Sequence, residues 1–101
     1  MTGERLIRLR QQLGLTQEGL GRLLDVSFAT INRWEREATS GPHGPVLAFL
    51  KALETALQHD PQLGARLDEW IARGSNFLWA QVFELAHRGQ SKTVERPRKR
   101  G

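Results

Sequence analysis

The sequence predicts an all-α fold, and three observations support this. Apolar residues recur at spacings of three and four along most of the chain, which is typical of helices with one buried face. No stretch alternates apolar and polar residues for long enough to indicate a β-strand. Capping residues and glycines separate the helical stretches at short intervals. With 101 residues, the chain can build one modest core but is too short for a large catalytic cleft.

The first part of the chain is expected to form three helices, over residues 3–13, 17–24 and 27–36. Gly14 suits the end of the first helix, because glycine adopts a left-handed backbone without strain. Thr16 is a good N-cap for the second helix, and Ser27 is a good N-cap for the third. Asp25 and Val26 form the short turn between the second and third helices.

The second part of the chain is expected to form three more helices, over residues 45–58, 61–73 and 76–88. Pro45 and Pro61 stand where the first turn of a helix tolerates proline. Gly74 and Gly89 follow the last residues of the fifth and sixth helices. Residues 90–101 contain one aliphatic residue among dense charges, so we expect a disordered basic tail there.

The net charge of +4 is concentrated at the C-terminus. Residues 1–58 contain 7 basic (Lys, Arg) and 6 acidic (Asp, Glu) side chains, and residues 59–89 contain 3 basic and 4 acidic ones. Residues 90–101 contain 5 basic side chains and 1 acidic one. The overall charge is therefore weak evidence about what the folded part binds. The tail would either add non-specific attraction to phosphates or serve only as a solubilising end.

Several functional classes are excluded or disfavoured. The chain has no cysteine, which excludes disulfides and thiolate metal sites, and its three histidines lack the spacing of a metal site. It shows neither a Ser, His and acid grouping nor a glycine-rich phosphate loop, so we expect no enzyme and no cofactor. The N-terminus is charged and no apolar run reaches the roughly 18 to 20 residues of a membrane span, so we expect a soluble cytoplasmic protein.

The third expected helix has two chemically different faces. At about 100° per residue, Thr30, Ile31 and Trp34 point toward a core. The opposite face presents Phe28, Ala29, Asn32, Arg33 and Arg36. Guanidinium, carboxamide and methyl groups are those that read base edges and phosphates in a DNA major groove. Phe28 lies at the edge of this outer face, so it could press on a thymine methyl group or tuck against the preceding turn.

Residues 4–58 resemble the Cro/C1-type (XRE) helix-turn-helix regulators, a lambda-repressor-like family of five-helix DNA-binding domains. The resemblance lies in LRQQLGLTQEGLGRLLDVSFATINRWERE, residues 9–37, where Thr16 and Gln17 open the second helix. Asp25 departs from the family, which usually has glycine at this left-handed turn position, although aspartate tolerates it better than most residues. Gly21 matches the family's need for a small residue where the second and third helices cross.

The resemblance implies a role for each matching residue. Gln17, at a helix N-terminus, would contact a DNA phosphate. The base-reading positions are Phe28, Ala29, Asn32 and Arg33. Arg33 suits guanine and Asn32 suits adenine, because each can form two hydrogen bonds to that base. The residues flanking them on DNA are Ser27, Thr30 and Arg36. Arg10 and Glu35 would form the family's ion pair between the first and third helices.

The sixth expected helix carries an apolar arc of about 160°, wider than the roughly 100° that one core requires. We therefore expect a homodimer, since helix-turn-helix proteins commonly bind paired half-sites as two-fold dimers. The expected interface residues are Trp70, Leu78, Trp79, Val82 and Phe83. The alternative is that this helix closes the core formed by the first, fourth and fifth helices.

These observations predict a DNA-binding domain over residues 1–58, a helical hairpin for dimerisation or partner binding over 59–89, and the tail over 90–101. The expected function is sequence-specific regulation of transcription, as a repressor that inserts residues 27–36 into the major groove of double-stranded DNA at the nucleoid. One alternative is an antitoxin-type autoregulator whose C-terminal helices bind a toxin or other partner protein. Another is a retained scaffold without affinity for DNA.

Overall fold

Six helices form the regular structure of residues 1–38 and 40–94, which are the residues that the computed structural model describes. Side chains are described as far as residue 88 of the last helix. The helices are α1 (Gly3–Gln12), α2 (Gln17–Leu24), α3 (Phe28–Glu35), α4 (Gly44–His59), α5 (Leu63–Ala72) and α6 (Ser75–Val94). The predicted all-α class is confirmed. None of the helices in these ranges is long and apolar enough to cross a membrane.

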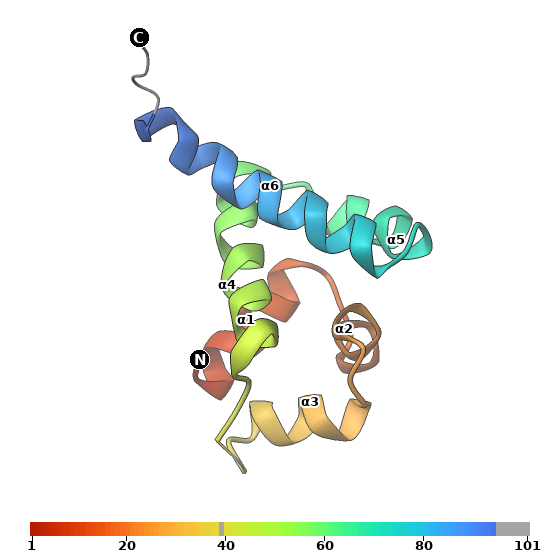
Figure 1. The fold of residues 1–101 in the computed structure, drawn as a ribbon. Coiled ribbons are helices and arrows are strands. Elements are labelled where there is room, and N and C mark those ends of the chain that lie inside the picture. Colours follow the sequence, from red (N-terminus) through yellow and green to blue (C-terminus); the bar gives the residue numbers. More distant parts are fainter. Residues whose placement is uncertain (39, 95–101) are drawn as a thin grey trace, which may run out of the picture.

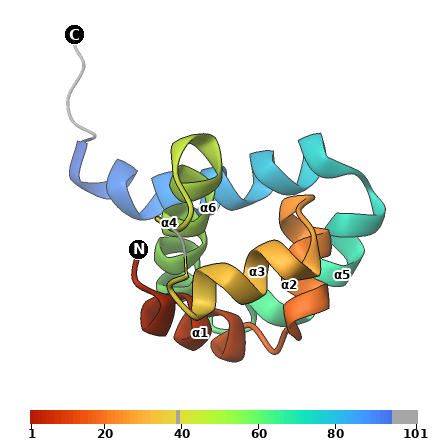
Figure 2. The same ribbon diagram turned by 90° about the horizontal axis from the view of Figure 1, so that it is seen from below.

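Helix α3 lies at one end of the molecule and α6 lies at the other, with α4 between them (Figure 1). Seen from below, α3 lies in front, beside α2 and α1 (Figure 2). Contacts between α2 and α3, and between α1 and α3, hold the third helix from two sides. Because its remaining side has no covering helix, α3 can present a face to a partner.

Local capping sets the starts of α2 and α3 as the sequence predicts. The hydroxyl of Thr16 accepts a hydrogen bond of 2.9 Å from the amide of Gly19, and the hydroxyl of Ser27 accepts one of 3.1 Å from the amide of Thr30. These bonds satisfy amides that have no partner within the helix. Asp25 ends α2 in the left-handed conformation expected of that position, with φ of 60°.

One continuous apolar core joins all six helices. In α4, Phe49, Leu50 and Leu53 are fully buried. The fully buried apolar residues of the other helices are Leu6, Leu9, Leu20, Ile31, Leu63, Leu67, Leu78 and Val82. Because these residues come from every helix, the core is continuous from the helix-turn-helix part to the last two helices.

Helix α6 closes this core. For the apolar arc of the sixth expected helix, closing the core was the alternative to forming a dimer interface. Trp79 stacks on Phe49 of α4, with ring centroids 4.5 Å apart and planes 8° from parallel. Phe83 packs at a tilt against both rings, 5.9 Å from Phe49 and 6.2 Å from Trp79. The wide apolar arc of α6 is thus used mainly within the chain.

Two expected helix boundaries are wrong. Helix α5 begins at Leu63 rather than Pro61, because residues 61–62 form a turn in which Asp60 accepts a hydrogen bond of 3.0 Å from the amide of Gln62. Helix α6 continues past Gly89 to Val94, so the disorder expected from residue 90 does not hold for residues 90–94. A single glycine costs a helix only about 1 kcal/mol, which need not end one already anchored on a core. The rest of the expected tail, residues 95–101, lies outside the described residues.

Candidate nucleic-acid interface

The outer face of α3 carries an unusual apolar residue. Phe28 is 52% exposed, and it is the one large hydrophobic residue exposed in the part of the chain that the structure describes. Three residues further along, Ile31 is fully buried, and Trp34 is half-buried against the core. Burial thus separates Ile31 and Trp34 from the exposed Phe28. Thr30, also expected on the inner face, is half-buried and bonds to Ser27 at the surface.

Two arginines share this outer face with Phe28. Arg33 and Arg36 are both exposed. Their guanidinium groups make only long hydrogen bonds within the helix, of 3.4 Å from Arg33 to the hydroxyl of Thr30 and of 3.5 Å from Arg36 to Oδ1 of Asn32. Each guanidinium has five N–H donors, so one such bond leaves most of them available to a ligand.

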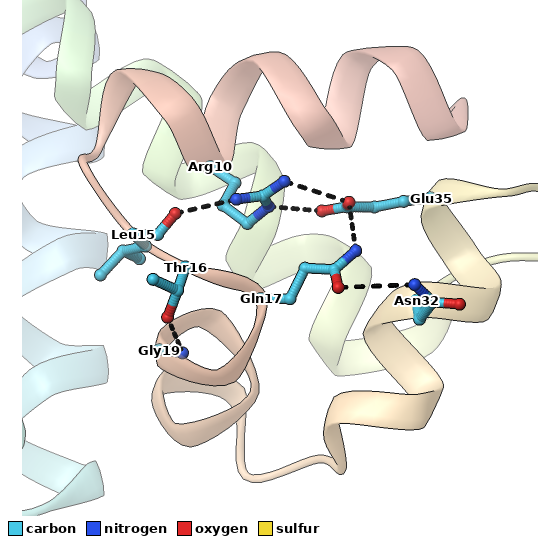
Figure 3. Close-up of polar contacts among 7 residues, drawn as sticks. All are labelled: Arg10, Leu15, Thr16, Gln17, Gly19, Asn32 and Glu35. Carbon is cyan, nitrogen blue, oxygen red and sulfur yellow. Dashed lines mark hydrogen bonds and ion pairs between the residues drawn. The ribbon is translucent and has the colours of Figure 1, made fainter.

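A buried-edge ion pair fixes α3 on α1. Nε of Arg10 lies 2.6 Å from Oε2 of Glu35, whose side chain is only 4% exposed. The same guanidinium donates from Nη2 to Oε1 of Glu35 at 3.3 Å and from Nη1 to the carbonyl oxygen of Leu15 at 3.0 Å (Figure 3). Because Arg10 also holds the chain just before α2, it couples the positions of the first three helices. The ion pair implied by the family resemblance is therefore present.

Gln17 lies within the same polar network. Its Nε2 donates a hydrogen bond of 2.8 Å to Oε1 of Glu35, and its Oε1 accepts one of 3.4 Å from Nδ2 of Asn32 (Figure 3). The sequence did not indicate either contact, because residues 15 and 18 positions apart follow no helical spacing. The side chain expected to reach a phosphate is thus directed toward α3.

A second connection between α1 and α3 also escaped the sequence analysis. The carboxylate of Glu37 accepts a hydrogen bond of 2.8 Å from the amide of Gly3, at the first turn of α1. Glu37 has a φ of 56°, in the left-handed region that follows a helix end. Nothing in the sequence indicated this contact, since Glu37 lies between the helices expected over residues 27–36 and 45–58.

The residues expected at a dimer interface are mostly inside the protomer. Leu78 and Val82 lie in its own core, and Trp70 is 9% exposed. A partner could not reach these three side chains unless the helices separated, so this part of the expected interface is corrected. Trp79 and Phe83 are half-buried and keep part of their surface free.

No group of three His, Cys, Asp or Glu side chains in the described ranges is placed to hold a metal ion. The polar residues of the interface are instead arranged as hydrogen-bond donors and acceptors at the surface of α3. This arrangement can recognise a ligand that offers both hydrogen-bonding edges and negative charge, as the major groove of DNA does.

Comparisons with known proteins agree with this geometry. A protein-family model described as "Helix-turn-helix" matches residues 6–58, which is more than half of the chain. Repressor protein C2 of Salmonella phage P22 is 27% identical over 105 aligned positions, which cover 87% of this chain and 47% of that repressor. The chain thus spans about half the length of this curated relative. No solved structure shows a significant match. The matched family model, together with the capped α2 and α3 and the ion pair behind them, places this chain in the XRE family of helix-turn-helix DNA-binding regulators.

Proposed function

We propose that this chain is a sequence-specific DNA-binding repressor that docks α3 in the major groove of double-stranded DNA. Such a protein would act in the cytoplasm, at the nucleoid. The observation that carries the proposal is that α3 exposes Phe28, Arg33 and Arg36. Figure 2 shows this helix in front, with one side that no other helix covers. A single exposed apolar residue is ordinary on a protein surface, so the support comes from its position on the recognition helix together with two exposed guanidinium groups.

The outer face of α3 offers a complementary group for each part of a groove. Arg33 is the proposed reader of guanine, because a guanidinium can donate to both O6 and N7. Phe28 and Ala29 would contact thymine methyl groups, which are the apolar feature of the major groove. The residues proposed to flank these contacts along the DNA backbone are Ser27, Thr30 and Arg36. A helix about 12 Å long, eight residues at about 1.5 Å each, fits across such a groove.

Repression rather than activation is supported by the name of the phage relative, Repressor protein C2. The simplest mechanism is occupancy, in which the bound protein blocks access to a promoter. A rival proposal, an antitoxin that binds a toxin through α5 and α6, has less support, because the apolar residues of those helices are mostly used in the chain's own core.

We also propose that the DNA-bound form is a homodimer on paired half-sites. Of the residues expected at its interface, Trp79 and Phe83 retain surface for a partner. Light scattering with and without DNA tests this part alone. A monomer in both conditions would remove the dimer from the proposal without affecting recognition by α3.

One experiment tests the proposed function. Selection of bound duplexes from a random DNA library should yield a defined half-site, and an Arg33→Ala variant should lose the preference for guanine at one position. A reporter promoter that carries the selected site should then be silenced by the protein. Failure of the wild-type chain to enrich any sequence would refute sequence-specific binding, and an enriched site that activates the promoter would refute repression.

A further inference from the structure

Asn32, on the outer side of α3, lies at the end of a chain of hydrogen bonds that begins in α1 (Figure 3). Arg10 donates to Glu35 at 2.6 Å, Gln17 donates to Glu35 at 2.8 Å, and Asn32 donates to Gln17 at 3.4 Å. Four side chains from three helices are thus joined in one network. The last of them is Asn32, whose carboxamide suits adenine.

The chemistry of the first two members sets the direction of every bond that follows. Arg10 can only donate hydrogen bonds, and the carboxylate of Glu35 can only accept them. Gln17 must therefore turn its NH₂ group toward Glu35, which leaves its carbonyl oxygen toward α3. That oxygen can only accept, so Asn32 must present its own NH₂ group to it. The guanidinium of Arg36, 3.5 Å from Oδ1 of Asn32, matches this orientation because it also only donates.

This orientation leaves Asn32 with one particular pair of free groups. One hydrogen of Nδ2 is used by Gln17, and the second remains available. The oxygen Oδ1 accepts from Arg36 but keeps a second lone pair for a base. Adenine offers an acceptor at N7 and a donor at N6 in the major groove, which are the complements of those two groups. Guanine offers two acceptors, N7 and O6, so its O6 would face the oxygen of Asn32 without a hydrogen between them.

We propose that Gln17 is a specificity-determining positioning residue, which selects adenine by fixing the orientation of the Asn32 amide. This inference rests on the proposed function, since it needs α3 to read base edges. It differs from the phosphate contact that the family resemblance implies for Gln17. A phosphate contact changes affinity for all sequences alike, whereas a positioning contact changes the preference at one base pair.

The substitution Gln17→Lys separates these two roles. Lysine can still pair with the carboxylate of Glu35, but it has no acceptor for Nδ2 of Asn32. Asn32 should then turn its oxygen toward the ammonium group and its NH₂ group outward, and two outward hydrogens suit the two acceptors of guanine. The preference for adenine over guanine at that base pair should fall by roughly 5- to 150-fold, the discrimination that one bidentate contact provides.

The measurement is library selection with four forms of the full chain. The wild type defines the half-site, and Asn32→Ala identifies the base pair that Asn32 reads. Gln17→Lys should change the preference at that base pair and at no other. The control Glu18→Gln changes the net charge by the same +1, by removing a carboxylate at the neighbouring exposed position outside the network, and should leave all base preferences as they are.

Three results would count against the inference. If Gln17→Lys changes affinity for every sequence by the same factor and keeps the preference for adenine, Gln17 is a phosphate ligand only. If Asn32→Ala changes no base preference, the network positions nothing that reads DNA. If the wild type enriches no sequence at all, the proposed function itself fails. Thermal unfolding of each variant checks its fold, and Gln17→Ala, which should broaden the preference at the same base pair, replaces Gln17→Lys if that variant does not fold.

Discussion

Gly21 of α2 lies against the carbonyl oxygen of Val26, in the turn that leads to α3. A Cβ atom at position 21 would sit 2.7 Å from that oxygen, closer than real Cβ atoms approach any atom of this kind. The absence of a side chain therefore lets the turn fold back onto α2. The family resemblance implied a small residue here for close crossing of the two helices, and the structure supplies the contact that requires it.

The first prediction follows from this contact. Gly21→Ala should lower the free energy of unfolding by about 1 to 3 kcal/mol, the usual cost of overpacking, although alanine favours helix by about 1 kcal/mol over glycine. Urea denaturation measures the change. Gly19→Ala is the matched control, because the nearest atom to its Cβ would be a side-chain hydroxyl at 3.3 Å, which can shift. Equal losses in the two variants would mean that the contact with Val26 is not the cause.

The second prediction concerns the ion pair between Arg10 and Glu35. Arg10→Met should cost about 3 to 5 kcal/mol of unfolding free energy, because it leaves the carboxylate of Glu35 buried without its cation. The double variant Arg10→Met with Glu35→Met should recover a large part of that loss, since it removes both charges. A double-mutant cycle, in which urea denaturation measures the unfolding free energy of each variant, gives the coupling free energy between Arg10 and Glu35. Additive losses would show that the two side chains do not act as a pair.

The third prediction separates reading of DNA from packing at Phe28. Because its side chain is half-exposed, Phe28→Ala should change the free energy of unfolding by no more than about 1 kcal/mol. The same variant should weaken binding to the selected DNA site and lose one thymine preference, measured by competition with mutated sites. Ile31→Ala, on the buried face of the same helix, should instead cost about 2 to 5 kcal/mol of stability. A large loss of stability from Phe28→Ala would favour packing against the turn.

The fourth prediction tests what the aromatic residues of α6 do. Trp79→Ala removes the ring stacked on Phe49 and should lower the free energy of unfolding by about 2 to 3 kcal/mol. If the ring acts within the protomer, this loss should be the same at low and at high protein concentration. A loss that grows with concentration would indicate that Trp79 stabilises an oligomer. Glu84→Ala, at an exposed position of the same helix, is the control and should cost less than about 0.5 kcal/mol.

The sequence determined the local structure of the first three helices. Thr16 and Ser27 begin α2 and α3 because their hydroxyls satisfy free amides of the first turn, and this chemistry depends only on neighbouring residues. The two faces of α3 follow from helical periodicity in the same way. Both features were predictable because they act over a few residues along the chain.

The later boundaries were less predictable because packing competes with local signals. Gly89 looks like a helix end, yet α6 continues to Val94. Likewise, the apolar arc of α6 could not by itself distinguish a dimer interface from a core. Helix α4 provides the answer, because Phe49 stacks on the ring of Trp79 and most of the apolar arc of α6 therefore packs against the core.

The tertiary structure alone decided how the candidate interface is organised. Ordinary spacing rules connect neither Gln17 with Asn32 nor Gly3 with Glu37, because these pairs meet only when α1, α2 and α3 pack together. The sequence by itself determined which side chains face outward on α3. The packing of three helices around Glu35 determined which way the Asn32 amide points, because a carboxylate that can only accept hydrogen bonds orients each donor in turn.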